Sequence, residues 1–462
     1  MSLFRTKAIN ADLSCDTGLK RCLSALDLTL LGIGAIIGAG IFVLTGKAAA
    51  TQAGPAIVLS FVVSGIACTF SALAYAELAA SVGGCGSAYG YAYAGFGELF
   101  AWIIGWDLIL EYGVATPTVA IGWSGYFNNA LTALGLGLPA TLLHPPFGEE
   151  ISGYINLPAA SILLLLSILL AIGIRVSAHF NAIMVVVKLA AISIFITIAL
   201  FHINPENWHP FVPFGVSGIM GGAALVFFAY IGFDAVSTAA EETTNPQRNL
   251  PIGILASLAI CTVIYIVVSG LLTGIAPYQT LDTPSPVAEV LLRLGKNWAA
   301  GLIAAGAIAG LTTVMLVLYY GLTRVFLAMS RDGLLPPVFA TVNKRTQTPI
   351  RIILVSGLLM ATVAGFMPIR IVAELVNIGT MAAFVLVCGG VIILRYRHPN
   401  LHRPFKSPFS PLFPVLGIIA CLALMLSLPL VTWLRFFIWL AIGMVIYFSY
   451  SREHSLLAQE QA

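Results

Sequence analysis

Glycines that interrupt an apolar segment are the first candidates for chemistry in this chain. Residues 32–42 read GIGAIIGAGIF and contain Gly32, Gly34, Gly38 and Gly40. In a helix interior each glycine costs about 0.8–1 kcal/mol relative to alanine. The stretch therefore combines the composition of a membrane-spanning helix with a backbone that favours an interruption. Backbone N–H and C=O groups released at an interruption can bind a polar ligand.

Three interpretations of this stretch can be compared. A nucleotide-binding loop needs G-x-G-x-x-G between a strand and a helix, but Ile37 occupies the third glycine position and no such unit surrounds it. Gly34 and Gly38 have the small-xxx-small spacing that lets two helices touch. The third interpretation is a break at membrane depth, where irregular backbone is tolerated only if protein buries it or water reaches it. The last two interpretations remain open on this stretch alone.

A second interrupted segment favours the break. Residues 227–242 read FFAYIGFDAVSTAAEE and place Gly232 and the acidic Asp234 in a predicted sixth span, 215–240. Paired interruptions at corresponding places in two halves of a chain point to the binding site of a secondary transporter. The two halves show no residue-level identity, so their symmetry is inferred from the positions of the spans.

The composition is that of an integral membrane protein. Of the 462 residues 59% are hydrophobic and 9% are charged, and the mean hydropathy is +0.98, whereas soluble domains carry about 25% charged residues. We expect an all-α protein with twelve transmembrane helices of about 20 residues each, the first and sixth of them broken. The expected parts are a cytoplasmic N-terminal segment (1–26), inverted repeats of five spans each (27–202 and 215–396), two appended spans (411–450) and a cytoplasmic tail (451–462).

Positive charges predict the orientation of the chain. Sixteen of the 22 lysines and arginines fall in segments that this scheme places in the cytoplasm, five fall outside, and Lys188 alone lies within a span. This bias follows the positive-inside rule. The first 26 residues also lack the apolar region and cleavage site of a secretory signal peptide. We therefore expect a multi-pass protein of the cell (inner) membrane with both termini in the cytoplasm, and the net charge of +3 indicates no nucleic-acid partner.

Charged residues within predicted spans are costly and usually functional. Asp107 and Glu111 lie four residues apart, on one face of the third span. Glu111 could face a cationic substrate side chain or a proton, or could be held structurally by neighbouring helices, whereas Asp107 is the more structural of the two. Asp234 could tie the second break together or join a proton relay. Lys188 could snorkel towards the cytoplasmic surface, as ammonium groups near helix ends commonly do.

Several classes of protein are disfavoured. The seven cysteines match no metal-site spacing and avoid the predicted external loops, so we expect neither a metal nor a structural disulfide. The sequence contains no G-x-x-x-x-G-K-[ST] motif for ATP and no H-E-x-x-H motif for zinc, and we expect no cofactor and no enzymatic activity. A channel is the main alternative class, but it should show repeated pore-lining polar stretches. The oligomeric state is not predicted.

Four stretches resemble the amino acid–polyamine–organocation superfamily: GIGAIIGAGIF, PAIVLSFVVSGIACTFSALAYAEL (55–78), FFAYIGFDAVSTAAEETTNPQRNLP (227–251) and SRDGLLP (330–336). Within it, the chain is most similar to bacterial members of the cationic amino acid transporter family. The resemblance implies the five-plus-five inverted-repeat fold of the leucine-transporter type. It also implies that Lys188 lies against the break in the first helix, where sodium-coupled relatives hold a cation, so that sodium is not needed.

The resemblance places amino acid recognition at the two breaks. A half-helix starting near Gly38 presents N–H groups and a positive dipole end to a carboxylate. Carbonyls of the half-helix ending near Ile36 and of the second break suit an ammonium. The residues that carry these contacts by resemblance are Ile36, Gly38, Ala39, Gly40, Phe228, Ala229 and Ile231. Ala39 stands where some relatives have a hydroxyl residue, so one hydrogen bond is lost there. Leu318 and Phe228 are expected to select substrate size.

We therefore predict a secondary active transporter that imports small neutral or cationic amino acids by alternating access across the lipid bilayer. Coupling to protons, without sodium, is expected to involve Lys188, Asp234 and Glu111. An amino acid exchanger without net proton coupling is the alternative within the carrier class.

Recognition through the backbone predicts how substrate analogues behave. Hydrogen bonds to a charged group contribute about 1.5–3 kcal/mol, so removing the carboxylate should weaken binding by about tenfold or more. Amino acid amides and decarboxylated amines should therefore compete poorly against uptake of a labelled amino acid. Competition by the amine equal to that of its parent amino acid would contradict the assignment of the site to the breaks.

Overall fold

The computed structural model describes residues 5–6, 21–82, 87–133, 135–146, 153–283, 285–367, 369–428 and 430–460. In these ranges the secondary structure consists of helices and one isolated bridge, between Leu23 and Thr243. The expected all-α fold is confirmed for this part of the chain. Cys15, Cys85 and most of the predicted N-terminal segment lie outside the described residues, and the buried cysteines Cys68, Cys261, Cys388 and Cys421 are free thiols.

The helices follow one another along the chain as α1 (Ala25–Ile36), α2 (Thr45–Ala48), α3 (Ile57–Ser81), α4 (Ala88–Gly95), α5 (Glu98–Ala133), α6 (Leu157–Ile172), α7 (Ile174–Leu200), α8 (Gly215–Val226), α9 (Pro246–Ile275), α10 (Pro286–Arg293), α11 (Asn297–Arg331), α12 (Ile350–Phe366), α13 (Ile369–Arg397), α14 (Leu412–Met425), α15 (Leu430–Ile446), α16 (Arg452–His454) and α17 (Leu456–Glu460). Wider π turns form η1 (Gly40–Leu44), η2 (Ala49–Ala53) and η10 (Tyr447–Ser451). Tighter 3-10 segments form η3 (Gly54–Ala56), η4 (Ala140–Leu142), η5 (Pro205–Trp208), η6 (Phe227–Tyr230), η7 (Asp234–Glu242), η8 (Tyr278–Thr280) and η9 (Pro337–Phe339).

The surface and the helix lengths are those of a membrane protein. Eight helical segments of the described chain are long and apolar enough to cross a bilayer, and three shorter apolar helices, α6, α12 and α14, accompany them. Large apolar side chains face outward on these elements, among them Leu165 (61% exposed), Leu358 (63%) and Leu434 (61%). A surface of this kind suits lipid rather than water. The chain is therefore a multi-pass membrane protein.

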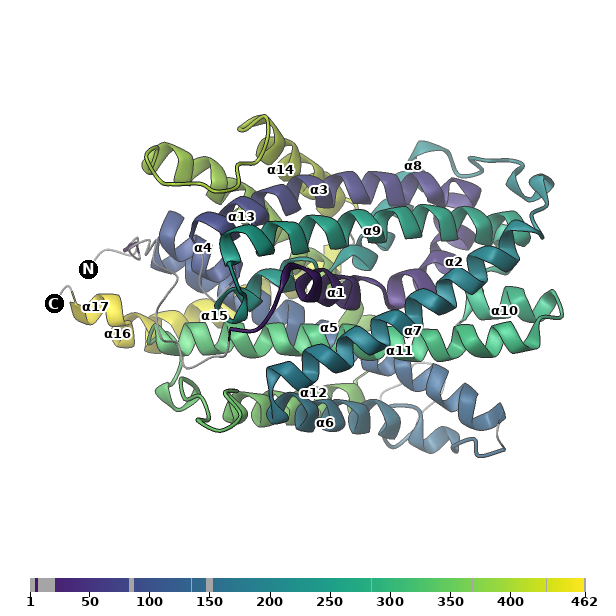
Figure 1. Cartoon of the computed structure of the whole chain (residues 1–462), viewed down its shortest axis with the longest axis horizontal. Helices are drawn as coiled ribbons and strands as arrows, with labels where there is room; N and C mark the ends of the chain where they lie inside the picture. The colour runs from purple at the N-terminus through teal and green to yellow at the C-terminus, as the bar shows by residue number, and fades with distance from the viewer. Residues whose placement is uncertain are drawn as a thin grey trace.

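Helix α1 lies in the middle of the bundle (Figure 1), in contact with α7, α9 and α11. Its start is fixed by a capping box, in which the Asp27 amide donates to Ser24 Oγ at 3.3 Å and the Ser24 amide donates to the Asp27 carboxylate at 2.8 Å. From Leu31 to Ile36 every residue is buried. A helix that is apolar on all sides needs such an enclosure. Around it α3 packs on α8 and α9, α11 packs on α5 and α7, and α13 packs on α5 and α14.

The first glycine-rich stretch is both broken and closely packed. Helix α1 ends at Ile36, Ile37 is extended, and helical structure resumes at Gly40 with the wide turn η1. Gly34 and Gly38 meanwhile lie in close contact with Asn181 and Val314 of the neighbouring helices. The two interpretations that the sequence leaves open are therefore compatible with each other.

The second interruption follows helix α8. The chain passes from Val226 into the 3-10 turn η6 and resumes as η7 at Asp234. Gly232, between η6 and η7, has a φ of +117°, which only glycine adopts without strain. A Cβ atom at Gly232 would lie 2.6 Å from the Cβ atom of Ala35 in α1. The two interruptions are consequently in direct contact.

Arg324 corrects the expected distribution of positive charge. The scheme based on the sequence treats Lys188 as the sole cation inside a span. Arg324 instead lies within α11, where its side chain is 2% exposed and forms an ion pair with Glu242. Because a buried charge needs a partner of opposite sign, the position of this arginine depends on a residue 82 positions away.

Candidate substrate site at the two helix breaks

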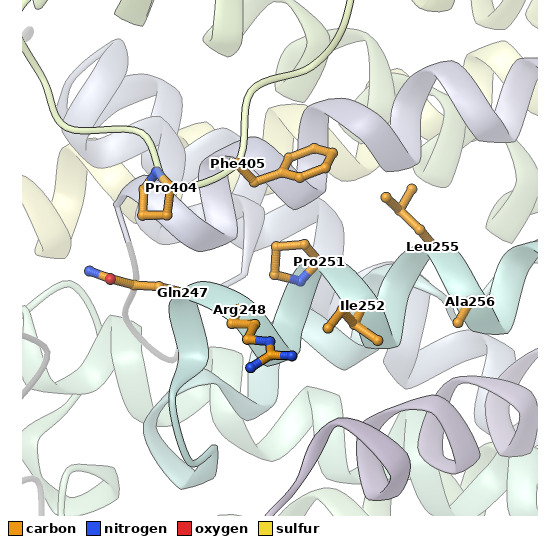
Figure 2. A pocket seen from close by; sticks show the side chains of 8 residues that line it. All are labelled: Gln247, Arg248, Pro251, Ile252, Leu255, Ala256, Pro404 and Phe405. Carbon is orange, nitrogen blue, oxygen red and sulfur yellow. The ribbon is translucent and has the colours of Figure 1, made fainter.

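A small enclosed cavity lies where the two breaks meet. Its volume of about 10 Å³ is room for roughly one water molecule. The residues that line it carry no charged side chain: they are Ala35, Ile36, Gly38, Ala39, Gly40, Ala115, Val119, Phe228, Ile231, Val314 and Leu318. A much larger cavity, of about 580 Å³, lies beside the start of α9 (Figure 2).

Most of the residues predicted to bind substrate line this small cavity. They are Ile36, Gly38, Ala39, Gly40, Phe228, Ile231 and Leu318. Ala229 and Glu111 are absent from its lining. Glu111 lies one helical turn before the lining residue Ala115 on the same face of α5, and its carboxylate is near Thr380 of α13 rather than in the cavity wall.

Four lining residues were missed in the sequence: Ala35, Ala115, Val119 and Val314. For three of them the sequence carried a signal, because residues four positions apart lie on the same face of a helix. Ala115 and Val119 follow Glu111 at this spacing, and Val314 precedes Leu318 by the same interval. These positions bring the apolar faces of α5 and α11 to the breaks.

The Tyr265 hydroxyl connects the two breaks. This side chain of α9 lies 2.6 Å from the carbonyl oxygen of Ile36 and 2.9 Å from that of Ala229. A hydroxyl has one proton to donate, whereas each carbonyl has two lone pairs to offer. The two carbonyls together therefore keep accepting capacity for a further donor, such as an ammonium group. Sequence reasoning missed Tyr265, since its role depends on where α9 crosses α1.

Gly40 has no room for a side chain. A Cβ atom there would lie 2.2 Å from the Cβ atom of Ala229 and 2.4 Å from its Cα atom. Since the second of these atoms belongs to the backbone, no rotation of a side chain can relieve the overlap. The backbone at Gly40, where η1 begins, is therefore in direct contact with the backbone of the η6 turn.

Lys188 is bound at the end of α1. Its Nζ atom lies 2.8 Å from the Ile33 carbonyl, and 3.0 Å from each of the Gly34 and Ile37 carbonyls. The Thr313 hydroxyl, at 3.0 Å, completes the set. The side chain is 0% exposed, so it does not snorkel to a surface.

This position suits a cation for two reasons. The last carbonyls of a helix have no intrahelical partners and carry the negative end of the helix dipole. The four oxygens around Nζ also form the type of ligand set that a hard metal cation takes in proteins. Lys188 thus supplies a covalently attached cation where a free ion would otherwise fit.

Asp234 stabilises the second break. One carboxylate oxygen accepts from the Gly232 amide at 3.2 Å, and the other accepts a short hydrogen bond from the Tyr112 hydroxyl. Ser237 donates to the Asp234 carbonyl at 2.6 Å. These contacts fasten the start of η7 to α5, and they leave the carboxylate buried next to the break.

Glu111 and Asp107 are buried carboxyl groups of a different kind. Glu111 is 0% exposed and has Thr380 of α13 beside it, but no cation among the described residues pairs with it. Both carboxylate oxygens of Asp107 lack a hydrogen-bond partner in the same part of the chain. A charged carboxylate in such a place is costly, so both groups are suited to carry a proton.

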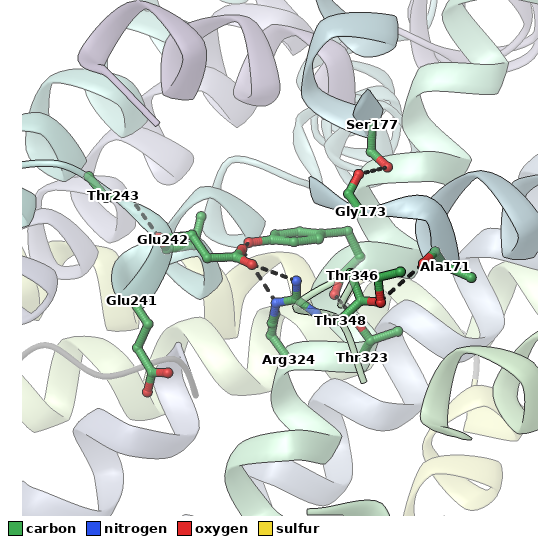
Figure 3. Close-up of polar contacts among 12 residues, drawn as sticks. Ala171, Gly173, Ser177, Glu241, Glu242, Thr243, Thr323, Arg324, Thr346 and Thr348 are labelled. Atoms are coloured by element: carbon green, nitrogen blue, oxygen red, sulfur yellow. Dashed lines mark hydrogen bonds and ion pairs between the residues drawn. The ribbon is translucent and has the colours of Figure 1, made fainter. Parts of the chain in front are cut away.

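A buried ion pair joins the end of η7 to α11 (Figure 3). Glu242 Oε1 and Arg324 Nη2 are 2.7 Å apart, and the two side chains are 1% and 2% exposed. The Tyr320 hydroxyl donates to the same carboxylate, and the guanidinium lies 4.4 Å from the centroid of the Tyr320 ring. Glu242 ends η7 and Tyr320 is two residues beyond Leu318, so the pair joins η7 to α11, which also lines the cavity.

Backbone hydrogen bonds tie the start of α1 to the same place. The Leu23 amide donates to the Glu242 carbonyl at 3.0 Å, and the Thr244 amide donates to the Leu23 carbonyl at 2.9 Å. Near the C-terminus, the Leu456 amide donates to the carbonyl of Asp332, which directly follows α11. Because segments close to both ends of the chain are bound here, we call this side of the molecule the terminal end. At the terminal end, α1, η7 and α11 are therefore held together.

A cavity between two interrupted helices of a membrane protein is typical of a transporter. The amino acid permease family matches residues 23–448 of the chain. The protein belongs to this family, and the resemblance to the amino acid–polyamine–organocation superfamily is confirmed.

The relatives are transporters and permeases. The chain is 49% identical to the methylthioribose transporter of Bacillus subtilis over 458 residues and 50% identical to the branched-chain amino acid permease BcaP of the same organism over 463 residues, with 99% of each chain covered. It is 32% identical to the human cationic amino acid transporter 4, over 96% of this chain and 89% of that protein.

Substitution of Gly40 tests the contact between the breaks. Gly40→Val should reduce uptake by about tenfold or more, because an added side chain forces the breaks apart and overpacking of a tight core costs about 1–3 kcal/mol. Gly301→Ala in α11 is the matched control, since a Cβ atom at that position meets nothing within 4 Å. Uptake in cells, normalised to the amount of inserted protein, separates the two. Normal uptake by Gly40→Val would overturn the geometry.

Removal of the Lys188 ammonium tests the support of the first break. Lys188→Ala removes one donor from three carbonyls and a hydroxyl. The Ile33 carbonyl keeps the Ile37 amide and the Gly34 carbonyl keeps the Thr313 hydroxyl, so the lost charge-assisted bonds together cost at least about 1–3 kcal/mol. We expect a lower melting temperature and a loss of uptake of about tenfold or more. Lys47→Ala, an exposed lysine beyond the break, is the control and should behave as the unmodified protein. Wild-type melting and uptake by Lys188→Ala would contradict this role.

Proposed function

We propose that the protein imports amino acids by alternating access, driven by protons and without sodium. The observation that supports this most strongly is the contact of two helix breaks around one enclosed cavity, with Lys188 bound at the end of the first. Carboxylate and ammonium groups of an amino acid are complementary to the released N–H and C=O groups there. Binding would require the cavity to expand from its present volume of about 10 Å³.

The lining favours neutral aliphatic substrates. Beyond the breaks, Ala115, Val119, Val314 and Leu318 offer only apolar contacts to a substrate side chain. A cationic side chain would be desolvated there without a partner unless it reached Glu111. The name of BcaP, the branched-chain permease that is 50% identical to this chain, points in the same direction. We therefore propose small to branched aliphatic amino acids as substrates, with cationic amino acids as the second candidate.

Alternating access needs a closure that can open. The terminal end has the buried pair of Glu242 and Arg324 and the backbone bonds of Leu23. We propose that this end faces the cytoplasm and that substrate is released there when these contacts separate. Counting Ala25–Ser81 as two crossings and including the three shorter apolar helices gives the twelve spans of the inverted-repeat arrangement.

Protons are the proposed coupling ion. Lys188 fills the place in which a sodium ion would find oxygen ligands, which removes the need for sodium. Among the buried acids, Glu111 lies one helical turn before the lining residue Ala115 and pairs with no cation of the described chain, whereas Asp234 is already hydrogen-bonded to the second break. Glu111 is therefore the better candidate for taking up a proton on one side and releasing it on the other. Exchange of one amino acid for another, without protons, remains the alternative mode.

Uptake into proteoliposomes tests this function. With an imposed inward proton gradient and no sodium, labelled leucine or alanine should accumulate, and a protonophore should abolish the accumulation. Leucine should compete better than arginine, because the lining is apolar. A strict sodium requirement would refute the proposed coupling, and uptake only into vesicles preloaded with amino acid would identify an exchanger. Flux that never saturates with substrate concentration would indicate a channel.

A further inference from the structure

The larger cavity lies at the terminal end, away from the helix breaks. It has a volume of about 580 Å³ and is formed between the first turns of α9 and the loop that follows α13 (Figure 2). Pro251 and Leu255 of α9 form one side, and Phe405 of the loop covers the other. Its position at the terminal end follows from Thr244, which is hydrogen-bonded to Leu23 just before α9 begins.

One end of this cavity is cationic. Arg248 lines it, is exposed, and has no ion pair or side-chain hydrogen bond with any described residue. Lys406, which follows the lining residue Phe405, is exposed and also has no partner in this part of the chain. By contrast, Arg395 in the last turn of α13 and Arg403 in the loop are both within ion-pair distance of Glu77. The start of α9 adds the positive end of a 30-residue helix.

The other end of the cavity continues onto the lipid-facing side of α9. Ile252 lines the cavity and is 41% exposed. Further along the same helix, Ile260, Val263 and Val267 are 41%, 61% and 37% exposed. These side chains mark the face that α9 turns towards the hydrocarbon of the bilayer. The cavity therefore lies at the boundary of the bilayer, with uncompensated positive charge on its polar side and an apolar surface leading away from it.

We propose that this cavity binds an anionic phospholipid from the leaflet at the terminal end. The phosphate would lie beside the Arg248 guanidinium, at the positive end of the α9 dipole, and both features suit an anion. One acyl chain would follow Leu255 and Phe405 and then the exposed face of α9 around Ile252. A soluble anion would use only the positive charge, and a neutral lipid would use only the apolar surface. The match of both features favours an anionic lipid.

Binding of short-chain phosphatidylglycerol to the purified, delipidated full-length protein tests the proposal, with phosphatidylcholine of the same chain length for comparison. Phosphatidylglycerol should bind more tightly. Arg248→Ala should weaken its binding by about fivefold, the usual contribution of one basic side chain at an anionic membrane surface, and Arg248→Lys should retain most of it. Arg345→Ala, which removes an exposed arginine outside the cavity, is the matched control and should change nothing.

Ala256→Trp keeps all charges and fills the apolar part of the cavity, so it should abolish binding while the melting temperature of the protein is retained. If this variant is unstable, Leu255→Trp serves the same purpose. Equal affinity for the two lipids, or unchanged phosphatidylglycerol binding by Arg248→Ala, would overturn the proposal. Displacement of the lipid by an equal concentration of inorganic phosphate would also overturn it, since that result identifies a site for soluble anions. All these measurements are independent of transport.

Discussion

The bond between the Lys188 ammonium and the end of α1 is the interaction on which the rest of the site depends. A helix that stops inside a bilayer leaves carbonyl groups that water cannot reach, and each such group is expensive if nothing else binds it. Lys188 binds three of them at once and matches the dipole of the helix that ends there. The glycines permit the backbone conformation of the break, and Lys188 supplies the hydrogen bonds that the freed carbonyls need within the bilayer.

The second break depends on the first. Gly40 meets Ala229, Gly232 meets Ala35, and the Tyr265 hydroxyl touches a carbonyl of each break. A shift of either interrupted segment would therefore disturb the other. Asp234 adds a link to α5, which also contributes lining residues to the cavity. The cavity is consequently formed by several helices that hold one another, and no charged side chain lies in its wall.

Sequence reasoning succeeded where the signal was local. The apolar segments and the glycines of GIGAIIGAGIF and FFAYIGFDAV place the breaks where α1 and α8 end, and most of the residues assigned to the breaks line the cavity. It failed where the partner lies on another helix. Tyr265 and the pairing of Arg324 with Glu242 depend on how α9 and α11 cross the broken segments, and no local pattern encodes these crossings. The number of spans and the role of each site residue stay predictions.

The chemistry of the closure at the terminal end affects how easily it can be reversed. When Glu242 and Arg324 separate, water can solvate both charges, and this hydration offsets much of the attraction that is lost. A closure made of leucines would instead expose apolar area on opening, at about 25 cal/mol per Å² with nothing to offset it. A charged closure is thus nearly balanced between its shut and hydrated forms. A small difference in free energy between these two forms would then be sufficient to tip the balance.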